Sequence, residues 1–190
     1  EIYEYAAEDN NTRRADILVS VSPPPDLVVG GVISPSTGNS GTAISVQWSV
    51  ANPGSADALR SWSDRVMIGK SPVYDPDSAT VLGTFFNVRG LERDSSYTRQ
   101  ANVILPNGIS GPYYVYVEAD WKKEVFEYTF ESNNVGTAAT VVSLSPWADL
   151  EVAPVVAPAT ATANDIVSVE WTVTKNGSSG AAGSWVDSVY

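Results

Sequence analysis

The stretch AISVQWSV at residues 43–50 decides the fold, because from Ile44 onward its side chains alternate strictly between apolar and polar. The apolar side chains, which all fall on one face of an extended chain, are Ile44, Val46, Trp48 and Val50. One apolar and one polar face are typical of a strand that packs on a core from one side. The stretch therefore predicts a core strand in which Trp48 is buried.

The same stretch returns 123 residues later as SVEWTV at residues 168–173. Pairing each residue with the one 123 positions further on needs no gap, and 28 of the 67 overlapping pairs are identical. Self-similarity at a fixed interval indicates repeated modules. The sequence predicts the C-terminal hairpin of a preceding module at 1–23, a complete module at 24–146, and the N-terminal strands of a following module at 147–190.

Further short strands are predicted on both sides of residues 43–50. They cover residues 26–33, 62–68, 80–88, 95–105, 112–120 and 138–144, with 80–88 at an edge and Trp62 half-buried. The segments between them are rich in Gly, Pro and Asn, which favour turns. This spacing predicts an all-β fold, an antiparallel immunoglobulin-like β-sandwich in tandem repeats of 123 residues.

Charge and composition exclude several classes of function. The net charge of −11 argues against nucleic acid as a partner, because few cations are available to neutralise phosphates. The chain has no Cys and no His, which removes thiolate and His-ligated metal sites and His-dependent catalytic triads. No stretch is apolar enough to predict a membrane span. No pair of carboxylates is placed in an apolar setting, so no enzyme is expected.

Two clusters of acidic residues are candidates for calcium, which prefers six to eight hard oxygen ligands. Asp75 and Asp77 lie two residues apart in one loop, and Asp120 and Glu124 flank another. Neither cluster has the spacing of a dedicated calcium loop, and Asp75 and Asp77 would equally serve to cap a turn. Calcium is therefore one of two interpretations, and no other cofactor is expected.

Aromatic residues in one loop are candidates for binding glycan. Trp121 follows a predicted strand and Phe126 lies in the same loop, so the two rings are expected to form a platform for sugar if the loop folds suitably. The linkers form a third group of candidate residues, at the junctions between modules. Their residues are Pro23, Pro24, Pro25, Pro146 and Trp147. Short proline-rich linkers are stiff.

The motifs of residues 24–146 together resemble the CARDB family, the cell-adhesion-related domain found in bacteria. The resemblance is carried by Pro25-Asp26-Leu27, residues 50–54, Asp64-Arg65-Val66, residues 111–114, Asp120, Glu127, Glu131 and Asn133-Asn134. It implies immunoglobulin-like sandwiches arranged in tandem in large exported proteins of bacteria and archaea. It implies no catalytic motif, and an extracellular or cell-surface location.

These observations predict a structural repeat module of an exported stalk, adhesin, filament or surface layer. The alternative is a carbohydrate-binding module that uses its loop aromatics. Residues 1–23 and 147–190 are each expected to be an incomplete sandwich with unpaired strand edges. The expected partners are therefore neighbouring copies, arranged head to tail by strand complementation or within one longer chain.

Overall fold

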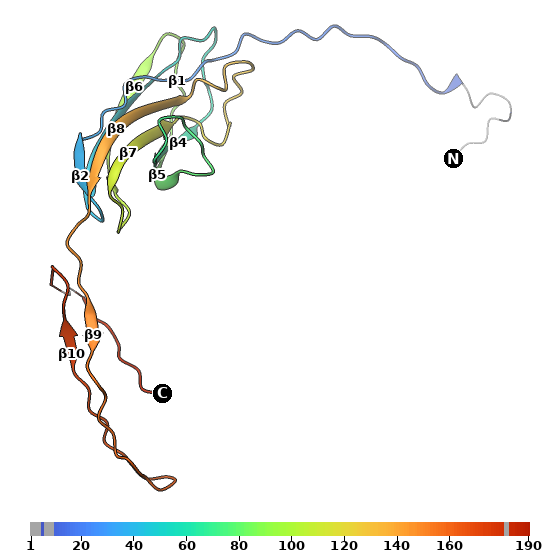
Figure 1. The fold of residues 1–190 in the computed structure, drawn as a ribbon. Helices are drawn as coiled ribbons and strands as arrows, with labels where there is room; N and C mark the ends of the chain where they lie inside the picture. The colour runs from blue at the N-terminus through green and yellow to red at the C-terminus, as the bar shows by residue number, and fades with distance from the viewer. Residues whose placement is uncertain (1–4, 6–9, 181–182) are drawn as a thin grey trace.

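The computed structural model describes residue 5 and residues 10–180 and 183–190. One sandwich forms the body of the molecule, with an N-terminal segment leading to one end and a C-terminal hairpin following from the other (Figure 1). Residues 12–27 of the N-terminal segment form no strand. The hairpin predicted within residues 1–23 falls in part on residues 1–4 and 6–9, outside the described residues, so it stays a prediction.

The sandwich consists of two sheets and is all-β, as predicted. The smaller sheet has the order β1-β3-β6, with β1 at Val28–Val29, β3 at Ala43–Ala51 and β6 at Ser96–Ile104. The larger has the order β2-β8-β7-β4-β5, with β2 at Thr37–Asn39, β4 at Trp62–Gly69, β5 at Thr80–Asn87, β7 at Gly111–Glu118 and β8 at Val135–Ser143. The strand predicted at 80–88 is β5, which lies at an edge of the larger sheet. None of the described segments is a helix of the length and hydropathy needed to cross a membrane.

The core lies between the sheets and is built on β3, whose residues alternate between buried and half-buried as predicted. Trp48 has no exposed surface and packs at 5.3 Å from the ring of Phe85. Val66 of β4 and Val115 of β7 face the same core and are also fully buried. Trp62 was predicted to be half-buried, and this is wrong: its ring is fully buried, because its Nε1 finds a hydrogen-bond acceptor inside the core.

The strand predicted at 26–33 lies along the smaller sheet, where β1 pairs with β3 and Ile33 forms an isolated bridge with Gln47. The chain then crosses to the larger sheet, where β2, which was not predicted, runs parallel to β8. The prediction of a wholly antiparallel sandwich is therefore wrong at this pair. Gly38 of β2 explains why so short a strand fits, since a Cβ there would lie 2.9 Å from Leu105 and 3.1 Å from Ile44.

The C-terminal hairpin pairs β9 (Leu150–Val152) with β10 (Val173–Lys175) in the register of β1 and β3. Val29 pairs with Val50, and Val152 pairs with Val173, so each partner lies 123 residues further on. The isolated bridge between residues 33 and 47 likewise returns between residues 156 and 170. The repeat in the sequence is thus accompanied by a repeat in strand pairing.

Candidate functional site

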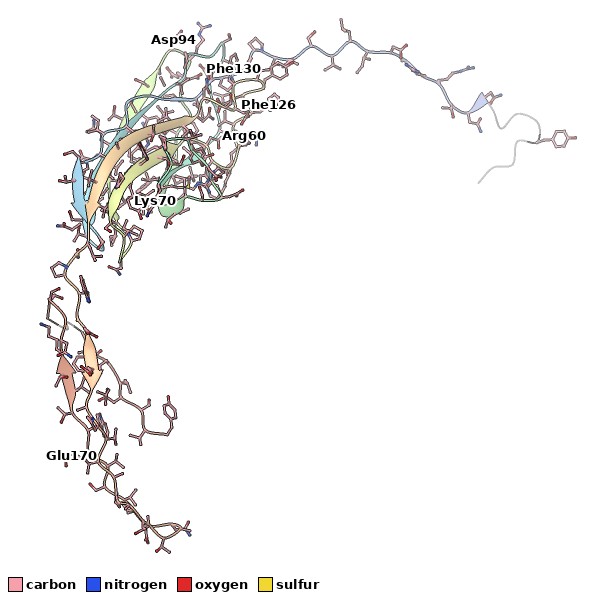
Figure 2. The ribbon with its side chains drawn as sticks, viewed as in Figure 1. Arg60, Lys70, Asp94, Phe126, Phe130 and Glu170 are labelled. Atoms are coloured by element: carbon pink, nitrogen blue, oxygen red, sulfur yellow. The ribbon has the colours of Figure 1, made fainter. Side chains whose placement is uncertain are left out.

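The functional candidates lie at the two ends of the sandwich, called here the N-terminal pole and the C-terminal pole. The N-terminal pole is formed by residues 24–27 and by the loops before β4, β6 and β8. The C-terminal pole is formed by the loops before β3, β5 and β7 and by the end of β8. Figure 2 shows Phe126 and Phe130 beside the entering N-terminal segment, and Lys70 toward the other end.

Hydrogen bonds from two loops hold the chain as it enters the N-terminal pole. The carbonyl of Pro24 accepts from the amide of Ser55 at 3.0 Å. The amide of Asp26 donates to Oδ1 of Asn52 at 3.0 Å, and the Asn52 side chain is fully buried. Asn52 also donates to two carbonyls, so it fixes the entering chain and the turn after β3 together.

The loop at residues 119–134 is hydrogen-bonded to the same segment through a buried carboxylate. Glu127 has no exposed surface, and its Oε2 accepts from the amide of Leu27 at 2.6 Å. Its Oε1 accepts from Nδ2 of Asn134 at 2.8 Å, while Asn133 donates to the Asp26 carboxylate. Burial raises the pKa of Glu127 to about 7, because these hydrogen bonds only partly compensate for lost water. Glu127 and Asn133-Asn134 therefore position the linker.

Asp120 organises the beginning of that loop from the end of β7. Its two carboxylate oxygens accept from the amides of Glu124 at 2.9 Å and Val125 at 2.7 Å. The side chain is almost fully buried, and burial raises its pKa to about 6. Asp120 thus closes a turn, a role that the sequence predicted for Asp75 and Asp77 but not for Asp120.

Hydrogen bonds also hold the chain where it leaves the C-terminal pole. The amide of Ser40 donates to the carbonyl of Ser143, and the amide of Ser145 donates to Oγ of Ser40 at 2.9 Å. On the far side of the linker, the carbonyl of Trp147 accepts from the amide of Ser179 at 3.0 Å. Only Pro146 lies between these two fixed residues, and proline itself has a fixed φ.

A buried carboxylate that was not among the predicted site residues lies inside the core. Asp64 is fully buried, and its Oδ1 accepts from Nε1 of Trp62 and Nδ2 of Asn87, both at 3.0 Å. Its Oδ2 accepts from Nε1 of Trp48 at 2.9 Å and the hydroxyl of Tyr97 at 2.6 Å. Burial and the nearby carboxylate raise the pKa of Tyr97, so its hydroxyl remains a donor. The sequence signal is the recurrence of Trp-x-Asp at residues 62–64 and 185–187, and Trp171 again donates to Asp187.

The two predicted glycan-binding aromatics do not form a joint platform. Trp121 is half-buried, with the guanidinium of Arg65 at 4.7 Å from its ring centroid and Nζ of Lys122 at 5.2 Å. Phe126 is 68% exposed, and its ring neighbour is Tyr128 at 6.3 Å. The exposed rings of this loop therefore belong to Phe126, Tyr128 and Phe130, and Trp121 packs against cations.

The predicted calcium ligands all lie in turns. Asp75 accepts from the amide of Asp77 at 3.1 Å, and both residues are exposed in the loop after β4. Asp120 is engaged with two amides, and Glu124 is exposed beside it. The described part of the chain holds no group of three acidic side chains arranged for a metal ion. Calcium at these residues therefore stays a prediction.

The CARDB family model matches residues 24–138. The crystal structure of a CARDB domain from Pyrococcus furiosus, in complex with di-metal ions, is 21% identical, with a TM-score of 0.49 over 66% of this chain and 100% of that one. A β-glucosidase from Bifidobacterium adolescentis is 16% identical, with a TM-score of 0.41 over 62% of this chain and 17% of that one. None of the curated proteins matches the chain.

The family match begins at the N-terminal pole and ends within β8, so it covers all of the sandwich except the second half of that strand. It includes the two residues around which the interior is organised, Asp64 and Glu127. Because the matched residues make up more than half of the chain, the protein belongs to the CARDB family.

Proposed function

We propose that the chain is part of a tandem array of immunoglobulin-like modules that serves as a stalk, adhesin, filament or surface layer outside a prokaryotic cell. The observation that carries this proposal is the strand register, which returns at the same interval of 123 residues as the sequence. Membership of the CARDB family supports a structural or adhesion-like role at a surface. The partners of each module are then its neighbours along the array.

The mechanism of such a module is geometric. The linker residues on either side of Pro146 are each hydrogen-bonded to a different module, Ser145 to one and Trp147 to the next. A linker with one free residue, and that residue a proline, leaves few dihedral angles along which neighbours can swing. The array would therefore behave as a stiff rod.

The proposal is tested by completing the following module with the chain's own sequence. Residue 190 occupies the repeat position of residue 67, so residues 1–190 are followed directly by a second copy of residues 68–146. Trp171 and Trp185, which are 37% and 54% exposed, are expected to become buried as Trp48 and Trp62 are. The measurement is a blue shift of tryptophan emission and a second protease-resistant domain.

The matched control is the same long chain with Trp171→Ser, which removes the core ring of the second module and leaves the first untouched. It is expected to lose the second domain only. If residues 147–190 remain open to protease in the unsubstituted long chain, the tandem reading is wrong.

Glycan binding is a second candidate, favoured by the exposure of Phe126 and Tyr128, whose rings are 68% and 53% exposed. Aromatic faces stack on sugar rings, although these two are tilted by 59° and form no flat platform. If the candidate is right, residues 1–190 bind on a glycan array and Phe126→Ala abolishes binding. Phe86→Ala, on the edge strand β5, is the control for an exposed ring elsewhere. The absence of any bound glycan excludes this function.

A further inference from the structure

The loop before β8 exposes aromatic rings and buries a charge, the reverse of the usual arrangement at a surface. Phe126, Tyr128 and Phe130 are 68%, 53% and 40% exposed, whereas Glu127 between the first two is fully buried. Residues 126–130, which carry these three rings, are called the aromatic loop. A cluster of exposed rings of this kind marks a contact surface.

The backbone of the aromatic loop is fixed, so the exposure of its rings is built into the fold. The amide of Glu127 donates to Oε1 of Glu131 at 3.0 Å, and the amide of Phe130 donates to the carbonyl of Glu127 at 3.1 Å. The backbone of Tyr128 has a φ of 58°, in the left-handed region that residues other than glycine seldom adopt. The rings are therefore presented in a preformed arrangement.

The aromatic loop lies directly beside the entering linker. Glu127, within the loop, accepts from the amide of Leu27, three residues after Pro24. Pro24 stands at the repeat position of Trp147, the residue that follows the single free proline of the linker. In an array, the rings of one module must consequently face the C-terminal pole of the module before it.

The C-terminal pole offers a surface that fits aromatic rings. A hollow there has an apolar side and a hydroxyl side around one lysine, Lys70. The apolar side is lined by Ile68, Gly69, Pro106, Ile109 and Tyr113, and the hydroxyl side by Ser71, Ser78 and Thr80. Nζ of Lys70 lies 5.4 Å from the centroid of the Tyr113 ring. A second ring placed there would gain contact with the apolar wall and with the same cation.

We propose that the aromatic loop of each module packs into this hollow on the preceding module of the same chain, and so locks the angle between them. The inference rests on the proposed tandem array and names the contact that makes it rigid. The short linker holds the two surfaces at a high effective concentration, so even a weak contact would be formed in most molecules.

The test uses the long chain described above, residues 1–190 followed by a second copy of 68–146. Phe126→Ser, Tyr128→Ser and Phe130→Ser are introduced together, either in the second copy or in the first. Both variants change the same exposed residues, so both modules are expected to remain folded. Only the second copy faces a complete preceding module, which makes the first-copy variant a matched control.

The readout is amide hydrogen exchange at residues 107–109 of the first module, next to Pro106 in the hollow. We expect exchange at least tenfold slower in the long chain than in residues 1–190, with the protection lost in the second-copy variant and kept in the first-copy variant. Equal exchange in all these chains overturns the contact, including the case in which the rings bind a glycan instead. If the second module does not fold, the tandem array fails, and this inference fails with it.

Discussion

Replacing Asp64 with alanine is expected to lower the free energy of unfolding by about 4 kcal/mol, a large part of the stability of a module this size. The carboxylate accepts from four donors, and the alanine would leave three of them, on Trp48, Trp62 and Tyr97, without an acceptor in a closed core. The fourth donor, Nδ2 of Asn87, keeps the hydroxyl of Tyr97 as its acceptor. Each buried donor left unpaired costs about 1–3 kcal/mol, reduced where the site relaxes or admits water. Urea unfolding followed by tryptophan emission measures the loss as a lower midpoint at unchanged slope.

Asp187→Ala is the matched control for this experiment. Asp187 is the repeat counterpart of Asp64 and accepts from Nε1 of Trp171 at 3.0 Å, but it is exposed. Its replacement is expected to change the unfolding free energy by less than about 0.5 kcal/mol, as for most surface substitutions. A loss below about 1 kcal/mol for Asp64→Ala would mean that the network does not stabilise the core.

Between pH 5 and pH 8, the module is expected to become less stable as the pH rises. The pKa of Glu127 is raised from 4.5 to about 7 and that of Asp120 from 3.8 to about 6, in both cases mainly by burial. In that range the folded protein binds more protons at these groups than the unfolded chain does, so deprotonation favours unfolding. The protonated Glu127 alone would contribute about 3 kcal/mol to the free energy of unfolding at low pH. This contribution is lost as the pH rises from the unfolded pKa of 4.5 through the folded pKa of about 7. Urea midpoints at four pH values would measure this slope.

Glu127→Gln is expected to flatten most of this dependence. The Gln oxygen would still accept from Leu27, and its amide would donate to Oδ1 of Asn134 after that side chain flips, because Oδ1 now has no partner. Glu124→Gln, an exposed change in the same loop, is expected to alter the slope only slightly, because the charge of Glu124 is a lesser cause of the raised pKa of Asp120. Stability that rises from pH 5 to pH 8 in the unsubstituted chain would contradict the prediction.

Local patterns in the sequence predicted most of the fold. The alternation at 43–50 predicted β3 within one residue and the burial of Trp48, because period-two hydrophobicity reports which face meets a core. The strand β2 has the sequence TGN, which has no such pattern. It forms because β8 offers a free edge and Gly38 lets the backbone approach closely, both consequences of tertiary contacts.

The candidate site could be predicted only in part from the sequence, because its contacts join residues that are far apart along the chain. Proline content indicated stiff linkers at Pro23–Pro25 and Pro146, but the hydrogen bonds that grip them come from residues far away in sequence, as Glu127 is from Leu27. Trp121 was interpreted as a sugar platform because a tryptophan in a loop is usually accessible. Arg65, from another strand, lies over its ring, and no local pattern reveals that pairing.

The parallel pair of β2 and β8 has a mechanical consequence. β2 continues from the strand that enters at the N-terminal pole, and β8 leads out at the C-terminal pole, so tension applied to both ends pulls these strands in opposite directions along their length. The hydrogen bonds between them, extended by Ser40 and Ser143, would then be loaded together instead of opening one after another. The short strand that sequence patterns miss is thus the element that would resist when such a chain is stretched.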